Sequence, residues 1–107
     1  MTTSTIPTLD DATFDRAVAP GSGLVALEFG AEWCGACKVM APALHDVAHE
    51  LEGRVRFYSI DADVNAQTVT RFAVRSLPTV LLFRDGTLVD RIVGAQSRAV
   101  LRARLDV

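Results

Sequence analysis

The sequence predicts an α/β domain in which helices cover both faces of a central mixed β-sheet. Strand patterns alternate with helix patterns over the first two thirds of the chain, and two strands joined by a tight turn follow near its end. The chain has 107 residues, half of them hydrophobic, and contains no repeat, linker or low-complexity segment. This size and composition predict a single domain, residues 1–107, with one packed core.

Five strands are predicted from apolar runs and from the alternation of apolar and polar residues. They lie near Ile6 and over residues 24–29, 55–60, 79–83 and 88–93. The first long run indicates a largely buried strand, because Glu28 is its only charged residue. The sequence Arg84-Asp85-Gly86, between the last two strands, predicts a hairpin turn.

Four helices are predicted from capping residues and from apolar residues that recur three or four positions apart. Asp10 or Asp11 can cap the first helix, and Ser97 can cap the last. In the longest helix the recurring apolar residues are Met40, Leu44, Val47 and Leu51. The helices run from the first cap to Val18, over residues 34–51, onward from Asn65, and from Ser97 to Leu105.

Charge and composition exclude several classes of protein. The net charge is −2, and the 11 Lys and Arg residues form no long basic run, so no nucleic-acid partner is expected. No stretch approaches the roughly 18 apolar residues that cross a bilayer, so no membrane partner is expected either. The first residues lack the positive patch and apolar core of a secretory signal, and we therefore expect a cytoplasmic protein. In that reducing compartment two cysteines are more often catalytic or metal-binding than structural.

Both cysteines, Cys34 and Cys37, lie between the apolar strand and the longest helix. Free backbone N–H groups and the positive end of the helix dipole favour an anion at the first turn of a helix. A thiolate is such an anion, and only the thiolate attacks disulfides or binds metal. The two cysteines are also close enough along the chain to pair with each other. The segment therefore predicts dithiol–disulfide exchange.

A zinc site is the main metal-binding alternative, and it would need two further ligands. The candidates are His45 and His49 on the same helix, but Cys37 and His45 are about 12 Å apart along the helix axis. Four such ligands cannot share one ion through bonds of about 2.0–2.3 Å. Residues 61–65 begin like a calcium loop, yet the Gly and Glu that such a loop requires later are missing. No metal site is therefore expected.

Three further residues each allow two interpretations. Glu28 is either an edge or outward-facing residue, or a buried carboxyl with a raised pKa that passes a proton to or from Cys37 through water. Trp33 is either a core residue or a flat apolar shield beside the reactive turn. Pro78 either opens the following strand or forms a cis peptide bond that places Leu77 beside the cysteines.

Several motifs in a fixed order resemble the thioredoxin family over nearly the whole chain. They are Ala31-Glu32-Trp33-Cys34-Gly35-x-Cys37-Lys38, Ala41-Pro42, Asp61-x-Asp63, Val74-Arg75-Ser76-Leu77-Pro78-Thr79, Phe83-x-x-Gly86 and Val93-Gly94-Ala95. The resemblance implies the thioredoxin fold, with five mixed strands flanked by four helices. It also implies a monomeric protein-disulfide reductase that uses no cofactor besides its own disulfide and takes electrons from thioredoxin reductase.

The resemblance also implies roles for individual residues. Cys34 would be the exposed nucleophile that attacks the disulfide of a target protein, and Cys37 would resolve the mixed disulfide. Glu28 lies where the family usually keeps a buried aspartate, and Pro78 would be a cis-proline facing the cysteines. The shallow apolar surface on which partner proteins dock would consist of Trp33, Gly35, Ala36, Leu77, Pro78, Gly94 and Ala95.

The chain departs from the family pattern at four positions near this site. Ala36 replaces the usual proline between the cysteines, which should alter the redox balance because the relative stability of dithiol and disulfide sets the potential. Glu28 is longer than the usual aspartate, and Gly30 replaces a frequent aromatic residue. Ser59 replaces a lysine that is frequent near the buried acid. Without that lysine, Glu28 lacks a partner for its negative charge, which favours the neutral form of its carboxyl.

Two other functions are compatible with the same cysteine pair. Glu28 and the altered dipeptide between the cysteines suggest a disulfide oxidase or isomerase, whereas the missing export signal argues against that function. A non-catalytic binding module would use the cysteines only as a redox switch of its affinity. The family resemblance favours the reductase.

Overall fold

A five-stranded sheet with the strand order β1-β3-β2-β4-β5 forms the centre of the protein. The structure is a computed structural model that describes residues 6–107. Its strands are β1 (Thr8–Leu9), β2 (Leu24–Gly30), β3 (Val55–Asp61), β4 (Thr79–Arg84) and β5 (Thr87–Val93). β3 is parallel to β1 and β2, whereas β4 is antiparallel to β2 and β5. The predicted mixed sheet is therefore confirmed.

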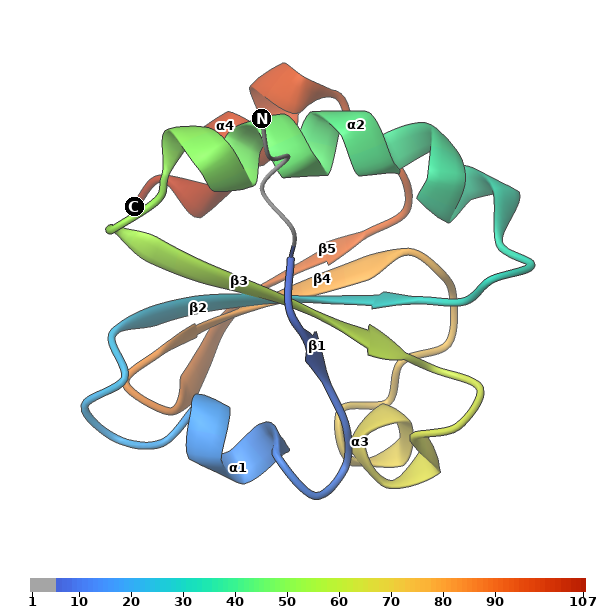
Figure 1. Ribbon diagram of the computed structural model, residues 1–107, viewed down its shortest axis with the longest axis vertical. Helices are drawn as coiled ribbons and strands as arrows, with labels where there is room; N and C mark the ends of the chain where they lie inside the picture. Colours follow the sequence, from blue (N-terminus) through green and yellow to red (C-terminus); the bar gives the residue numbers. More distant parts are fainter. Residues whose placement is uncertain (1–5) are drawn as a thin grey trace.

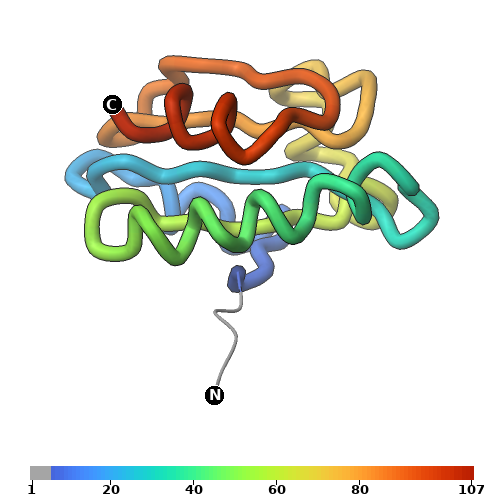
Figure 2. Tube along the Cα trace, turned by 90° about the horizontal axis from the view of Figure 1, so that it is seen from above, coloured from blue at the N-terminus to red at the C-terminus, as the bar shows by residue number. Residues whose placement is uncertain are grey.

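Helices cover both faces of this sheet (Figure 1). They are α1 (Phe14–Ala17), α2 (Gly35–Glu50), α3 (Ala66–Arg71) and α4 (Arg98–Leu105). α2 and α4 lie side by side over one face, as Figure 2 shows from above, and α1 and α3 lie over the other. This arrangement confirms the predicted α/β class, a mixed five-stranded sheet flanked by four helices.

The sheet divides the expected single core into two clusters. One lies beneath α2 and α4 and includes Met40, Leu44, Val47, Leu101 and Leu105. The other lies beneath α1 and α3, where the rings of Phe14, Phe72 and Phe83 pack at centroid distances of 5.3 to 5.6 Å. We call these clusters the α2/α4 core and the α1/α3 core.

β2, the central strand, leads directly to the cysteines. Successive side chains of a strand point to opposite faces of the sheet. Ala26 belongs to the α2/α4 core and Leu27 to the α1/α3 core. By the same alternation Glu28 and Gly30 face α2, on which the cysteines lie.

The N-terminal elements differ in position from the prediction. The predicted short edge strand is present, at Thr8–Leu9 just after Ile6, and Ile6 itself is buried in the α2/α4 core. The part of the polar N-terminal segment at residues 1–5 lies outside the described residues. Asp10 accepts a hydrogen bond from the Thr13 amide at 2.9 Å, and this turn delays the regular part of α1 until Phe14.

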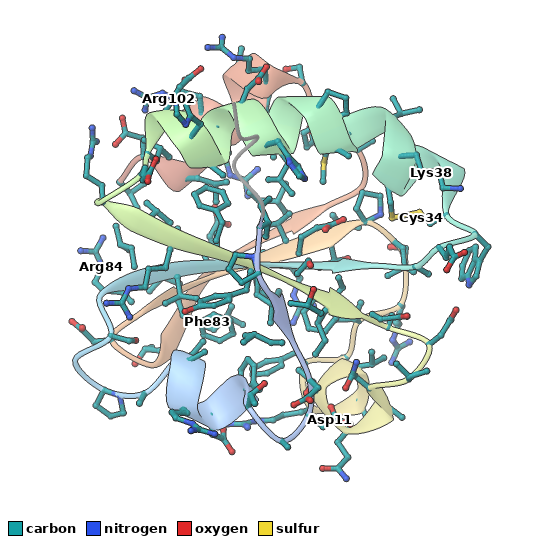
Figure 3. All side chains as sticks on the ribbon, in the orientation of Figure 1. Asp11, Cys34, Lys38, Phe83, Arg84 and Arg102 are labelled. Atoms are coloured by element: carbon teal, nitrogen blue, oxygen red, sulfur yellow. A yellow bond between two sulfur atoms is a disulfide. The ribbon has the colours of Figure 1, made fainter. Side chains whose placement is uncertain are left out.

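Asp11, the other expected cap of the first helix, caps α3 instead. Figure 3 shows Asp11 next to α3. Its carboxylate accepts hydrogen bonds from the Thr68 amide at 2.9 Å and the Thr68 hydroxyl at 2.6 Å. The first amides of a helix have no partner within that helix, and the Asp11 carboxylate satisfies two of them here, those of Gln67 and Thr68. The side chain of Asn65 accepts a hydrogen bond from the Asp11 amide at 2.9 Å, which ties the two segments together.

The C-terminal elements follow the prediction closely. Ser97 caps α4 by accepting a hydrogen bond from the Val100 amide at 3.2 Å, and the helix ends at Leu105. Asp85 and Gly86 form the turn between β4 and β5. Gly86 has a φ of 89°, a backbone conformation that glycine adopts without the strain of a side chain.

Candidate active site

The two cysteines lie where β2 has ended and α2 begins (Figure 3). Cys34 is the N-cap residue of α2 and has an extended backbone, whereas Cys37 lies in the first turn of the helix. The connecting loop is closed by a hydrogen bond from the Cys34 amide to the Ala31 carbonyl at 3.1 Å. This local structure presents both sulfur atoms at the N-terminus of a 16-residue helix.

Cys34 and Cys37 form a disulfide, and their Cα atoms are 5.3 Å apart. The amide of Cys37 donates a hydrogen bond to Sγ of Cys34 at 3.1 Å. After reduction, this donor and the positive end of the helix dipole would stabilise a negative charge on Sγ of Cys34. The geometry therefore favours Cys34 as the residue that carries the thiolate.

Neither cysteine is exposed in the disulfide form. The exposed fraction is 4% for Cys34 and 8% for Cys37, so the expected exposed nucleophile is not present in this state. The disulfide and the hydrogen bond from the Cys37 amide both hold the Cys34 sulfur against the first turn of α2. Gly35 and Ala36, between the cysteines, are exposed and border the disulfide on the solvent side.

Trp33 is 69% exposed, which excludes the interpretation as a core residue. Its indole N–H donates a hydrogen bond to Oδ2 of Asp63 at 2.7 Å. Asp63, in the loop that precedes α3, therefore holds the ring in place, and the ring presents an apolar surface beside Cys34. Sequence reasoning assigned Asp63 no part in the site, because no local spacing connects it to a residue 30 positions away.

The other expected docking residues lie at the ends of β4 and β5. The peptide bond between Leu77 and Pro78 is cis, which is the second of the two interpretations of Pro78. The amide of Gly94 donates a hydrogen bond to the Pro78 carbonyl at 2.8 Å, so the two segments lie side by side. Ala95 is exposed, but Pro78 is buried and Leu77 packs partly against the α1/α3 core.

The sheet register brings these residues to the same end of the molecule as the cysteines. Phe29, near the end of β2, pairs with Thr79, the first residue of β4. Pro78, which precedes β4, therefore lies next to the point at which β2 leads into the cysteine loop. The structure thus gathers the two groups of expected docking residues, although buried Pro78 contributes little of the exposed surface.

Glu28 lies on the inside of the sheet and not at an edge. Its strand, β2, has β3 on one side and β4 on the other, and its side chain is half-buried on the α2 face. Burial raises the pKa of the Glu28 carboxyl, because desolvation penalises the charged form. Within residues 6–107, Glu28 has no ion pair, and the residue opposite it in β3 is the uncharged Ser59.

The carboxyl of Glu28 and the sulfur of Cys37 both border the space beside Gly30. A Cβ atom built on Gly30 would lie 3.0 Å from Oε2 of Glu28 and 3.5 Å from Sγ of Cys37. A groove of about 420 Å³ opens from this point to solvent, and Lys38 and Ser59 are among its lining residues. Water in this groove can connect the two groups, which is the arrangement that proton exchange requires.

The described residues show no metal centre and no membrane-spanning helix. Within residues 6–107, no three His, Cys, Asp or Glu side chains are placed to hold one ion. His45 and His49 are exposed on α2, away from the buried face of that helix. In the same residues, no helix combines the length and the apolar character that a bilayer crossing demands.

Comparison with known proteins connects this geometry to a family. Residues 5–107 match the family model described as Thioredoxin. The chain is 39% identical to a thioredoxin of Pseudomonas aeruginosa over 101 residues, which are 94% of each chain. It is 42% identical to a thioredoxin of Staphylococcus aureus over 96 residues, which are 90% of each chain.

A plant relative is longer than this chain. The chain is 36% identical over 105 residues to a protein of Arabidopsis thaliana described as thioredoxin M2, chloroplastic. The matched residues are 98% of this chain and 56% of that relative, so the chain spans little more than half of its length.

Proposed function

This chain belongs to the thioredoxin family and is a thiol–disulfide oxidoreductase of proteins, and we propose that it works as a reductase through Cys34 and Cys37. The observation that supports this assignment most directly is the position of Cys34 at the N-cap of α2, where its sulfur accepts a hydrogen bond from the Cys37 amide. That position lowers the cost of a thiolate, and the thiolate is the attacking form of a thiol.

Two exchange steps complete the reaction. The Cys34 thiolate attacks one sulfur of a disulfide in the target protein, and the other sulfur of the target leaves as a thiolate. Cys37 then loses its proton and attacks Sγ of Cys34. The mixed disulfide breaks, the second sulfur of the target leaves, and the Cys34–Cys37 disulfide forms. The target has gained two electrons, and the protein has lost them.

We propose that Glu28 accepts the proton that Cys37 loses in the second step. Burial raises the pKa of Glu28, which makes its ionised form a stronger base than an ordinary carboxylate, and Glu28 borders the groove that Cys37 also borders. A water molecule in the groove would transfer that proton, since both groups border the same opening. In this mechanism Glu28 acts in the resolving step and has no part in the first attack by Cys34.

The target protein would bind around the disulfide. Trp33, Gly35, Ala36 and Ala95 offer exposed apolar surface, and Leu77, Pro78 and Gly94 lie behind it. The bond between Trp33 and Asp63 supports this arrangement, because it fixes the largest exposed apolar side chain beside the nucleophile.

The proposal also includes the electron donor, the compartment and the oligomeric state of the protein. A flavoprotein thioredoxin reductase would return two electrons to the disulfide, and no other cofactor is needed, since the two sulfur atoms hold the electron pair themselves. A reductase of this kind is useful only where its dithiol can be regenerated, which favours the cytoplasm. We further propose that the protein acts as a monomer, with the disulfide open to one target at a time.

Reduction of insulin by dithiothreitol tests the proposal. The protein should accelerate the reaction, Cys34→Ser should abolish the acceleration, and Cys37→Ser should trap target proteins as mixed disulfides. A redox-switched binding module would give no acceleration. If Cys34→Ser traps targets and Cys37→Ser does not, the assigned roles of the two cysteines are reversed.

The standard potential separates a reductase from an oxidase. Family values are about −270 mV for thioredoxin and about −180 mV for protein disulfide isomerase. Because Ala36 replaces the rigid proline, we expect a potential between these values and nearer the first. A potential at or above the isomerase value would rule out the reductase.

A further inference from the structure

Gly30 is the last residue of β2, and the carboxyl of Glu28 and the sulfur of Cys37 border the place that its side chain would take. A Cβ atom on Gly30 would meet Oε2 of Glu28 at 3.0 Å, a distance tighter than nine in ten contacts of real Cβ atoms. Its distance of 3.5 Å from Sγ of Cys37 would be an ordinary van der Waals contact. The Glu28 carboxyl therefore occupies the space that a side chain at position 30 would need.

The backbone itself does not require glycine at this position. The glycines with positive φ are Gly21, Gly23, Gly53, Gly86 and Gly94. Gly30 is not among them, and it lies in a regular strand paired with Asp61 of β3. Alanine can adopt such a conformation without strain, so space alone favours glycine here.

The length of the acid explains why this space is filled. Glutamate is longer than aspartate by one methylene, that is, by one C–C bond of about 1.5 Å. Glu28 and Gly30 are two positions apart on one strand and face α2 together. The extra methylene of Glu28 carries its carboxyl over Gly30, toward the first turn of α2, where Cys37 lies.

We propose that Gly30 is a positioning residue, and that its missing side chain lets the long acid at position 28 reach Cys37. Glu28 and Gly30 are then a pair matched in size. An aspartate at position 28 would leave room for a side chain at position 30, whereas the carboxyl of Glu28 would have to give way to one. This inference rests on the proposed function, in which Glu28 accepts the proton of Cys37.

A methyl group at position 30 should act through the position of the carboxyl. It would push Oε2 of Glu28 away from Cys37 into the groove, because the carboxyl is the flexible end of its side chain and the groove has room for it. The other ionisable groups that line the groove are Glu32, Lys38 and Asp61. The displaced carboxyl would be more hydrated, and its interaction with the Cys37 thiol would weaken.

Four full-length proteins test the pairing: the natural chain, Gly30→Ala, Glu28→Asp, and the double variant with both changes. The first readout is the rate of insulin reduction as a function of pH. The second is the titration of the Cys37 thiol, followed by thiolate absorbance after Cys34→Ser has been added to each protein so that only one thiol remains. The third is the free energy of unfolding of each protein.

We expect Gly30→Ala to slow insulin reduction about tenfold and to shift the Cys37 titration when residue 28 is glutamate. The same change should cost less than about twofold when residue 28 is aspartate, a non-additivity within the range found for residues in contact. Poor folding of Gly30→Ala that is relieved in the double variant would also support the pairing. Equal effects in the glutamate and aspartate backgrounds, on rate, titration and stability, would overturn it.

Gly35 provides the matched control for stability. A Cβ on Gly35 would meet nothing within 4 Å, so the effect of Gly35→Ala on unfolding should not depend on the acid at position 28. If the natural chain reduces insulin no faster than dithiothreitol alone, the proposed function fails. The Cys37 titration and the unfolding measurements then decide the pairing of Glu28 with Gly30 without reference to activity.

Discussion

Replacing Glu28 by glutamine should make the protein more stable at neutral pH and less active. Glutamine has nearly the same shape as a protonated glutamate but never carries a charge. In the folded protein, burial raises the pKa of Glu28 above its ordinary value of 4.5. Glu28 forms no ion pair within the described residues, and the residue opposite it in β3 is the uncharged Ser59. The charged form is therefore penalised by folding.

The pH dependence follows from the protons bound in each state. Below pH 4.5 the carboxyl is protonated in both the folded and the unfolded chain, so the natural protein and Glu28→Gln should respond alike to pH. Above that pH the unfolded chain loses the proton first, and folding must then take the proton up again. The natural protein should therefore lose stability relative to the variant by up to about 1.4 kcal/mol per pH unit. The loss should level off at the pKa of the folded state.

Urea unfolding at half-unit steps between pH 4 and pH 9 measures this difference. The pH at which the difference levels off gives the pKa of Glu28 in the folded protein. Glu32→Gln, the same change at an exposed position of the same groove, controls for the loss of one negative charge. A difference between Glu28→Gln and the natural protein that does not change with pH would contradict a buried carboxyl with a raised pKa.

Three further predictions concern contacts that join distant parts of the chain. Asp11→Ala should lower the melting temperature at neutral pH. Because hydrogen bonding to Thr68 lowers the pKa of Asp11, the difference in melting temperature between the natural protein and the variant, measured by scanning calorimetry, should shrink as the pH falls below 3.8. Asp63→Ala should raise the KM for insulin about two- to fivefold, with a smaller effect on kcat, because it frees the Trp33 ring. In a Trp33→Phe background, where this hydrogen bond cannot form, Asp63→Ala should have little effect, and an equal rise in KM there would contradict the prediction. Phe83→Ala should cost about 3–5 kcal/mol in urea unfolding, since this ring is 1% exposed; a cost below 1 kcal/mol would refute the packing argument.

The features that the sequence predicted best depend on neighbours in the chain. α2 was predicted from its apolar spacing, α4 from its cap at Ser97, and the helix N-terminus at Cys34 from the strand before it and the helix after it. Each of these patterns is complete within one or two turns of the chain. The same holds for the β4–β5 hairpin, whose turn residues lie between two strand patterns.

The features that the sequence missed join segments far apart in the chain. Asp11 caps a helix 57 residues further on, and Asp63 holds a tryptophan 30 residues before it. Both were recognisable as turn or cap residues, but neither residue type identifies its partner. The exposure of Cys34 was also missed, because it depends on the disulfide and on the Cys37 amide and not on residue type.

Glu28 connects the stability of the protein to its proposed chemistry. A charged residue in the middle of a buried strand is the clearest local inconsistency in the sequence, and such inconsistencies are expected at functional sites. The structure shows what the inconsistency consists of: a half-buried carboxyl with no ion-pair partner in residues 6–107, turned toward Cys37 over a glycine. A group that disfavours its own charge binds a proton more tightly, which is what a proton acceptor for a thiol requires. The stability that glutamine should restore at this position is therefore the same free energy that makes glutamate effective in the resolving step.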